Sequence, residues 1–113
     1  MHQRKATFTF IAVTLGAVAA GWSWAAWAAT LTVAQHGRAF QPNEIQLNAG
    51  DVADFVNDDR DLLHHAYLKT PGFSFDTGEQ EPGTTAHVRF TTPGTFTVLC
   101  GIHPKMRLSV VVR

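Results

Sequence analysis

Residues that favour turns recur at short intervals from Thr30 to the C-terminus of this chain. The turn signals are His36-Gly37, Gln41-Pro42-Asn43, Asn48-Ala49-Gly50-Asp51, Asn57-Asp58-Asp59, Pro71-Gly72, Glu81-Pro82-Gly83, Pro93-Gly94 and His103-Pro104. Glycine, proline, asparagine and aspartate supply the backbone conformations that tight turns need. No apolar run between these signals is long and periodic enough to predict a helix. The spacing therefore predicts a series of short strands.

Apolar and polar residues alternate in the segments between the turns. Phe96 and Val98 are one example, and this period of two is typical of strands that bury one face. A chain of 113 residues holds at most one small domain. The pattern predicts an all-β sandwich or barrel of seven or eight strands. The irregular segment from Pro71 to Gly83 is expected to cross the outside of the sandwich, with Phe73 and Phe75 packed beneath it.

The N-terminal part has the pattern of a secretory signal peptide. Residues 2–5 are basic or polar, and the next 24 residues, 6–29, carry no charge. Small residues flank Trp27, so we expect cleavage after Ala28 and a mature domain of residues 29–113. An uncleaved anchor is the alternative, because the uncharged stretch is long enough to span the ~30 Å hydrocarbon core of a bilayer. In both cases the domain is exported, to the periplasm or to another compartment outside the cytoplasm.

The charge of the exported part argues against nucleic acid as a partner. Of the nine Lys and Arg residues, Arg4 and Lys5 lie in the leader, which leaves seven against nine Asp and Glu, a net charge of −2. Phosphate binding depends on clustered Lys and Arg, and no such cluster is present. The acidic run of Asp58, Asp59 and Asp61 is predicted to be a solvated turn rather than a pair of catalytic carboxylates.

Cys100 is the single cysteine, so it has no disulfide partner within the chain. In an oxidising compartment, a lone thiol is expected to be buried, linked to another chain or bound to a metal. On the predicted strand, Phe96, Val98 and Cys100 share the inward face. Met106 begins the inward-facing set of the last strand.

If these two strands are neighbours, Cys100 and Met106 reach the same buried point at one end of the sandwich, because facing side chains lie ~4.5 to 5.5 Å apart at Cβ. His103 lies at the middle of the loop between them. A second imidazole is available from His64 or His65. Alternation favours His64, which shares the inward face of Ala66.

Soft sulfur donors combined with imidazole indicate copper. Two histidines and one cysteine with a weak axial methionine form the geometry of a blue-copper electron-transfer site. Zinc accepts cysteine and histidine but gains little from a thioether.

The C-x-x-H-x-x-M loop, with Pro104 directly after the histidine, resembles the cupredoxins, the type 1 blue copper proteins of the plastocyanin and amicyanin type. The resemblance extends from about Thr30 to Arg113. It implies a Greek-key β-sandwich that carries single electrons between larger redox proteins. It also implies one bound copper ion, Cu(II) or Cu(I). Carried over residue by residue, the copper ligands are His64, Cys100, His103 and Met106.

One departure from the family pattern is visible. The family commonly places an asparagine six residues before its first histidine ligand, whereas Asn57 lies seven residues before His64. The loop from Asp58 to Leu63 is therefore one residue longer than usual.

The resemblance implies a monomer whose redox partners dock transiently near His103. Two alternatives use the same chain differently. One is a periplasmic copper carrier or chaperone with the same ligands, and the other is a β-sandwich interaction module without metal, in which Cys100 is merely buried. An enzyme is not expected, because four protein ligands leave no open coordination position.

Overall fold

The computed structural model describes residues 27–113, so the predicted leader lies almost wholly outside the described part. The described chain forms nine strands and no helix, and thus contains no helix that could cross a membrane. The strands are β1 Thr30–His36, β2 Ala39–Gln41, β3 Glu44–Leu47, β4 Val52–Asn57, β5 Ala66–Lys69, β6 Ser74–Asp76, β7 Thr85–Arg89, β8 Gly94–Cys100 and β9 Arg107–Val112.

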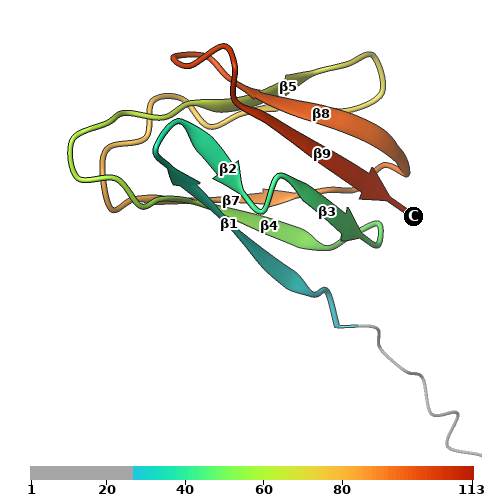
Figure 1. Ribbon diagram of the computed structural model, residues 1–113. Helices are drawn as coiled ribbons and strands as arrows, with labels where there is room; N and C mark the ends of the chain where they lie inside the picture. The colour runs from blue at the N-terminus through green and yellow to red at the C-terminus, as the bar shows by residue number, and fades with distance from the viewer. Residues whose placement is uncertain (1–26) are drawn as a thin grey trace, which may run out of the picture.

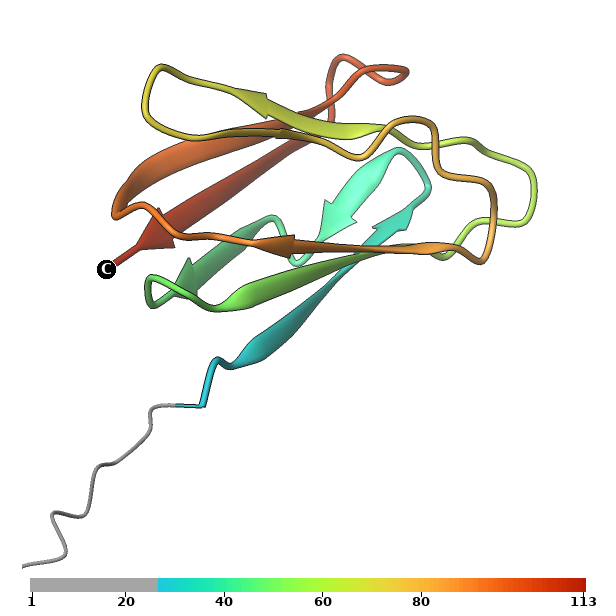
Figure 2. The ribbon, with the colours of Figure 1, turned by 180° about the vertical axis from the view of Figure 1, so that it is seen from behind.

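The strands form two sheets that pack face to face (Figures 1 and 2). One sheet has the order β2-β1-β4-β7, and the other has the order β3-β9-β8-β5-β6. The pairs β1–β4 and β3–β9 are parallel, and the remaining pairs are antiparallel. The predicted Greek-key β-sandwich is confirmed, with nine strands rather than seven or eight. Two of the nine strands, β2 and β6, have only three residues each, and so short a strand shows almost no alternation in the sequence.

Alternation along the strands fills the space between the sheets. Phe96, Val98 and Cys100 of β8 are buried, whereas Thr95 and Thr97 between them are exposed. On β9, the alternate apolar residues from Leu108 to Val112 are buried in the same way. Full burial of a Val, Leu or Phe side chain contributes about 1.5–3 kcal/mol. The predicted inward faces of both strands are therefore confirmed.

The segment from Pro71 to Gly83 is more regular than predicted, because it contains β6, which pairs with β5. Its two phenylalanines are half-buried and pack against the core, as expected. The ring of Phe73 lies 5.2 Å from that of Phe90, and the ring of Phe75 lies 5.7 Å from that of Phe55.

The β8–β9 hairpin positions the predicted sulfur ligands. The two strands are antiparallel neighbours, and their last paired residues toward the connecting loop are Leu99 and Arg107. Cys100 and Met106 are the next residues along each strand, so they follow the register at the loop end of the hairpin. Both are buried, as the alternation predicted.

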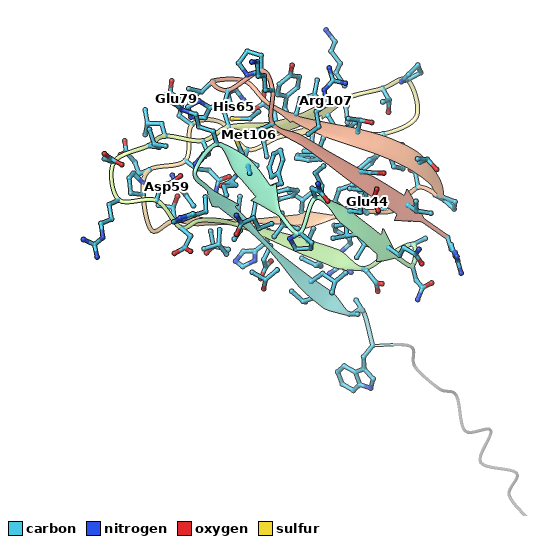
Figure 3. All side chains as sticks on the ribbon, viewed as in Figure 1. Glu44, Asp59, His65, Glu79, Met106 and Arg107 are labelled. Atoms are coloured by element: carbon cyan, nitrogen blue, oxygen red, sulfur yellow. The ribbon has the colours of Figure 1, made fainter. Side chains whose placement is uncertain are left out.

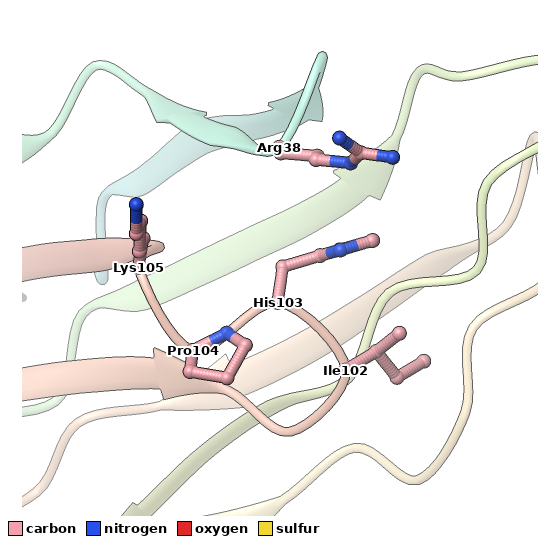
Figure 4. A pocket seen from close by; sticks show the side chains of 5 residues that line it. All are labelled: Arg38, Ile102, His103, Pro104 and Lys105. Carbon is pink, nitrogen blue, oxygen red and sulfur yellow. The ribbon is translucent and has the colours of Figure 1, made fainter.

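The β1–β2 hairpin turns through Gly37 and Arg38 only, since His36 pairs with Ala39. Both turn residues have positive φ, 58° for Gly37 and 62° for Arg38, as a two-residue type I′ turn requires. This tight turn holds Arg38 beside the loop that joins β8 to β9 (Figure 4).

Candidate metal centre

The four predicted ligands come from three parts of the chain that meet at one end of the sandwich. Cys100 ends β8, and Met106 immediately precedes β9. His64 lies just before β5 and forms an isolated β-bridge with Gln80. The side chains of His64, Cys100 and Met106 have exposed fractions of 0%, 2% and 1%, so water barely reaches them. His103, in the loop between β8 and β9, is half-buried.

His64 uses its two ring nitrogens differently. Nε2 donates a hydrogen bond to the Oδ2 atom of Asp59 over 2.6 Å. An ionised carboxylate can only accept, so Nε2 carries the proton and Nδ1 of the neutral ring keeps its lone pair. Nδ1 is buried and has no hydrogen-bond partner. A buried polar atom without a partner is costly in free energy. The lone pair of Nδ1 is therefore available to coordinate a bound metal ion.

His103 lies against His64. The ring centroids are 5.2 Å apart, and the ring planes are inclined by 61°. Nε2 of His103 donates to the backbone oxygen of Leu63 over 3.2 Å, so Nδ1 again keeps the lone pair in the neutral ring. The amide of Met106 donates to the oxygen of His103 over 3.0 Å, which closes the loop into a turn. Two imidazoles with the same tautomer therefore adjoin at this end of the sandwich.

Across residues 27–113, no three His, Cys, Asp or Glu side chains are grouped as a preformed metal site. The structure brings His64 and His103 together as a pair. Cys100 approaches the same end from β8, where it is the register partner of Ala66, two residues after His64. Met106 approaches it from the residue before β9.

A network of buried amides fixes the backbone around His64. Nδ2 of Asn57 donates to the oxygens of Leu62 and Gln80, at 2.8 and 2.9 Å. Gln80 and His64 exchange two backbone hydrogen bonds, at 2.7 and 3.2 Å. The Gln80 side chain donates to the oxygen of Phe55 over 3.0 Å. His64 is thus tied to β4 and to the segment before β7.

Asp59 corrects one prediction from the sequence. The run from Asp58 to Asp61 was expected to be a solvated turn, yet the Asp59 side chain is only 9% exposed. Its Oδ2 accepts from His64, its Oδ1 accepts from the amide of Gly37 over 3.1 Å, and its own amide donates to Asn57. The sequence signal for this role was the position of an acidic residue shortly before a candidate ligand. Gln80 carried no comparable signal.

The pKa of Asp59 reflects these contacts. Burial by itself raises the pKa of the carboxyl group. The hydrogen bond from His64, the bond from the Gly37 amide and electrostatic interactions with His64 and His36 outweigh burial and hold the pKa below its ordinary value. Asp59 therefore remains an ionised acceptor for His64 at neutral pH.

His65 points outward, as alternation predicted. Its ring is 27% exposed and bonds through Nε2 to Asp76. A hydrogen bond from the Gly78 amide, together with this bond to His65, lowers the pKa of Asp76. The backbone oxygen of His65 accepts from the amide of Gly101 over 2.8 Å. Figure 3 shows His65, Asp59 and Met106 at the same end of the sandwich.

The predicted donor set fits copper in several respects. A thiol, a thioether and a neutral imidazole nitrogen without a partner are all buried at this end of the sandwich. Soft sulfur with imidazole is the ligand combination that copper sites use. The hydrogen bond from His64 to Asp59 is the kind of contact that fixes the tautomer of a metal-binding histidine.

Comparison with known proteins gives two curated relatives, and no protein-family model matches the chain. The chain is 33% identical over 85 residues to the methylamine utilization protein MauL of Methylophilus methylotrophus, covering 73% of this chain and 47% of that protein. It is 33% identical over 76 residues to amicyanin-alpha of Methylorubrum extorquens, covering 65% of this chain and 63% of that protein. The chain thus spans about half to two thirds of the length of these relatives.

Solved structures share the fold. A Cu(I) form of an amicyanin variant aligns with a TM-score of 0.68 at 20% identity, over 74% of this chain and 82% of that chain. A Cu-containing nitrite reductase from Thermus scotoductus also aligns with a TM-score of 0.68, at 29% identity, over 74% of this chain and 22% of that chain. The sequence relatives and the shared sandwich together show that the chain is cupredoxin-like and similar to amicyanin.

Proposed function

We propose that this protein is an exported type 1 blue copper protein that carries single electrons between larger redox proteins. Its ligands would be His64, Cys100, His103 and Met106. When bound, copper would supply one-electron exchange between Cu(II) and Cu(I). The likeness to amicyanin-alpha and to a copper-containing nitrite reductase supports the choice of metal.

The observation that carries the proposal is the state of His64. Its ring is fully buried, its Nε2 is held by Asp59, and its Nδ1 has no partner while the ring adjoins His103. A core histidine with only a structural role would be expected to satisfy both nitrogens.

The surrounding residues suit an electron carrier. Cys100 and Met106 lie on or beside strands of one hairpin, and His64 is held by the Asn57 and Gln80 network, so these side chains need to move little between oxidation states. Pro104 has no N–H and cannot donate a hydrogen bond to the sulfur of Cys100, which keeps the thiolate electron-rich.

The route for the electron would be His103. It is the half-buried member of the four, and it lines a surface hollow together with Ile102 and Pro104. A partner docked there would come close to the metal without entering the core. Transient redox interfaces of this kind are small, below ~1,200 Å² in total.

An absorption spectrum of the oxidised, copper-loaded protein tests the proposal. We expect an intense blue thiolate-to-copper band that disappears in Cys100→Ser. Val98→Ala is the matched control, because it removes buried volume from the same face of β8 but no ligand. That control should lose stability, by about 0.5–3 kcal/mol, and keep the band. A protein that binds no copper, or a band that survives Cys100→Ser, would instead favour a β-sandwich module without metal.

A copper carrier or chaperone with the same ligands would differ in how fast it releases the ion. An electron carrier keeps its copper through many redox cycles, whereas a carrier of copper hands it to a partner. The rate at which a chelator removes Cu(I) separates the two. We expect the chelator to remove Cu(I) slowly. If copper leaves the protein faster than the protein exchanges electrons, the chaperone is favoured.

Export is part of the proposal. Cleavage after Ala28 would give a periplasmic chain of residues 29–113 that begins at Ala29. The intact mass of the protein recovered from the periplasm measures this. A mass that retains the leader, with the protein in the membrane fraction, would indicate an anchor.

A further inference from the structure

Two adjoining surface hollows flank the loop between β8 and β9. The larger, of about 500 Å³, is lined by Arg38, Ile102, His103, Pro104 and Lys105 (Figure 4). The smaller, of about 260 Å³, shares Arg38 and Lys105 with the first and extends to Met106 and Arg107. Arg38 and Lys105 therefore stand between the two hollows. Neither hollow is lined by Asp or Glu, and the Lys and Arg residues that line them are Arg38, Lys105 and Arg107.

None of these three cations forms an ion pair with an acidic side chain of the described chain. In residues 27–113, every ion pair joins a histidine to an aspartate, and none involves Arg38, Lys105 or Arg107. All three side chains are exposed. Residues 29–113 nevertheless carry nine acidic against seven basic side chains. The hollows beside His103 are thus lined by unpaired positive charge on a domain that is acidic as a whole. The acidic side chains of Asp58 and Asp59 lie on the other side of the β1–β2 turn, against His36 and Gly37.

Arg38 occupies this position against the preference of its backbone. Its φ of 62° lies in the left-handed region, where a residue other than glycine, asparagine or aspartate costs roughly 1–2 kcal/mol. An arginine held in a disfavoured conformation, beside a surface hollow, points to a role for its side chain. The turn aims Arg38 at the same hollow that His103 lines.

We propose that Arg38, Lys105 and Arg107 form a cationic rim that docks an acidic segment of a redox partner protein over His103. The proposal rests on the proposed function, in which His103 is the exit for the electron. Ile102, 37% exposed, and Pro104 form the apolar centre of this surface. An apolar centre with charges at its edge favours a protein surface over a free anion, because the charges orient the partner and the centre excludes water.

Titration of the copper-free protein with hexaglutamate, followed by NMR of the backbone amides, tests the rim without needing the metal. We expect shifts confined to Arg38, Ile102, Lys105 and Arg107, with affinity in the millimolar range at ~10 mM ionic strength, and loss of the shifts at ~0.2 M salt. Hexalysine should leave these amides unmoved. A short single-stranded oligonucleotide tests whether the rim binds nucleic acid instead. If the protein binds this oligonucleotide more tightly than hexaglutamate, the proposal is overturned.

Two substitutions and a control make the test specific. Arg38→Asn removes the charge and places a residue that tolerates positive φ at this position, so we expect weaker hexaglutamate binding, by about threefold or more, together with an unchanged or higher melting temperature. Lys105→Gln should weaken binding similarly. Arg113→Gln removes an equal charge at the opposite end of β9 and should have no effect. If all variants bind hexaglutamate equally, or if the amide shifts are scattered over the surface, the proposed cationic rim is wrong.

Electron exchange supplies a second readout on the copper-loaded protein. In each case one electron passes from the reduced protein to the oxidant, and no proton moves. Oxidation by anionic hexacyanoferrate(III) should slow about three- to tenfold in Arg38→Asn at low ionic strength, and oxidation by a cationic cobalt(III) complex should not. Absence of the blue band would count against the proposed function, whereas a normal band with charge-independent rates would count against the rim alone.

Discussion

The carboxylate of Asp59 binds Nε2 of His64 over 2.6 Å, and both side chains are shielded from water. The contact determines which nitrogen of His64 carries the proton. It leaves the buried Nδ1 as the ring nitrogen whose lone pair can coordinate a metal ion. The amide of Gly37 holds the other carboxylate oxygen, so the β1–β2 hairpin fixes the acceptor in turn.

Asp59→Ala is expected to lower the affinity for copper about 10- to 100-fold, because His64 loses the partner that fixes its tautomer and ring orientation. Asp59→Asn should retain more affinity, since its amide oxygen can still accept from Nε2. Competition with a chelator measures the dissociation constants. The control is Asp61→Ala, which removes an exposed carboxylate two residues away. Equal affinities for Asp59→Ala and Asp61→Ala would contradict the role of Asp59.

The stability of the copper-free protein should depend on pH through Asp59. Its pKa is lower in the folded than in the unfolded state, where aspartate titrates near 3.9, so its contribution to stability is present above about pH 4. That contribution disappears as the pH falls through the folded pKa. The difference in unfolding free energy between the wild type and Asp59→Asn should therefore be largest at pH 5–7 and shrink toward pH 2–3. Chemical denaturation at a series of pH values gives this difference, and a gap that widens on acidification would be the wrong sign.

Gly101→Ala is expected to destabilise the ligand loop by about 1–3 kcal/mol, the range for overpacking. A Cβ at Gly101 would lie 2.9 Å from Nδ1 of His65, whose ring is also held by Asp76. Gly72→Ala, where nothing lies within 4 Å of the added Cβ, should change stability by less than ~0.5 kcal/mol. Thermal unfolding of both variants measures the effect.

The same clash can be tested by removing the obstacle. In a double-mutant cycle, Gly101→Ala should cost less in a His65→Ala background than in the wild type, because the imidazole is no longer in the way. Additive costs would mean that Gly101 is required for another reason.

Met106→Leu should separate the packing role of the thioether from its role as a ligand. The side chains are similar in volume, so the apo protein should lose less than ~1.5 kcal/mol of stability. The reduction potential should rise, because the oxidised ion loses a donor. Redox titration and thermal unfolding measure the two effects. Leu108→Met, at the next inward position of β9, is the control and should leave the potential unchanged. An unchanged potential in Met106→Leu would assign the methionine to the core alone.

The ends of β8 and β9 could be predicted from the sequence because strand alternation is local. Once Phe96 and Val98 face inward, Cys100 must do so as well, and the same reasoning applies to Met106 before Leu108. Alternation also predicted that His64 is buried and that His65 lies nearer the surface. The assignment of His64 as a ligand remains a proposal that the copper titrations address.

The partners of these residues could not be predicted in the same way. The sequence predicts a solvated turn for Asp59 because it belongs to an acidic run with Asp58 and Asp61. Its burial depends on the approach of Gly37, in the turn of the β1–β2 hairpin. Gln80 looked like part of an irregular connection, yet it pairs with His64 through its backbone. Each of these contacts joins segments more than ten residues apart.

The sequence by itself determined the all-β class, the faces on which Cys100, Met106 and His64 lie, and the short loop that carries His103. These features follow from alternation and turn chemistry, which act within a few residues. Only the tertiary structure decided that Asp59 holds His64 and that Arg38 stands beside His103. Those relationships depend on how two sheets and three loops meet at one end of the sandwich. That meeting is set by packing across the whole core, and no local pattern records it.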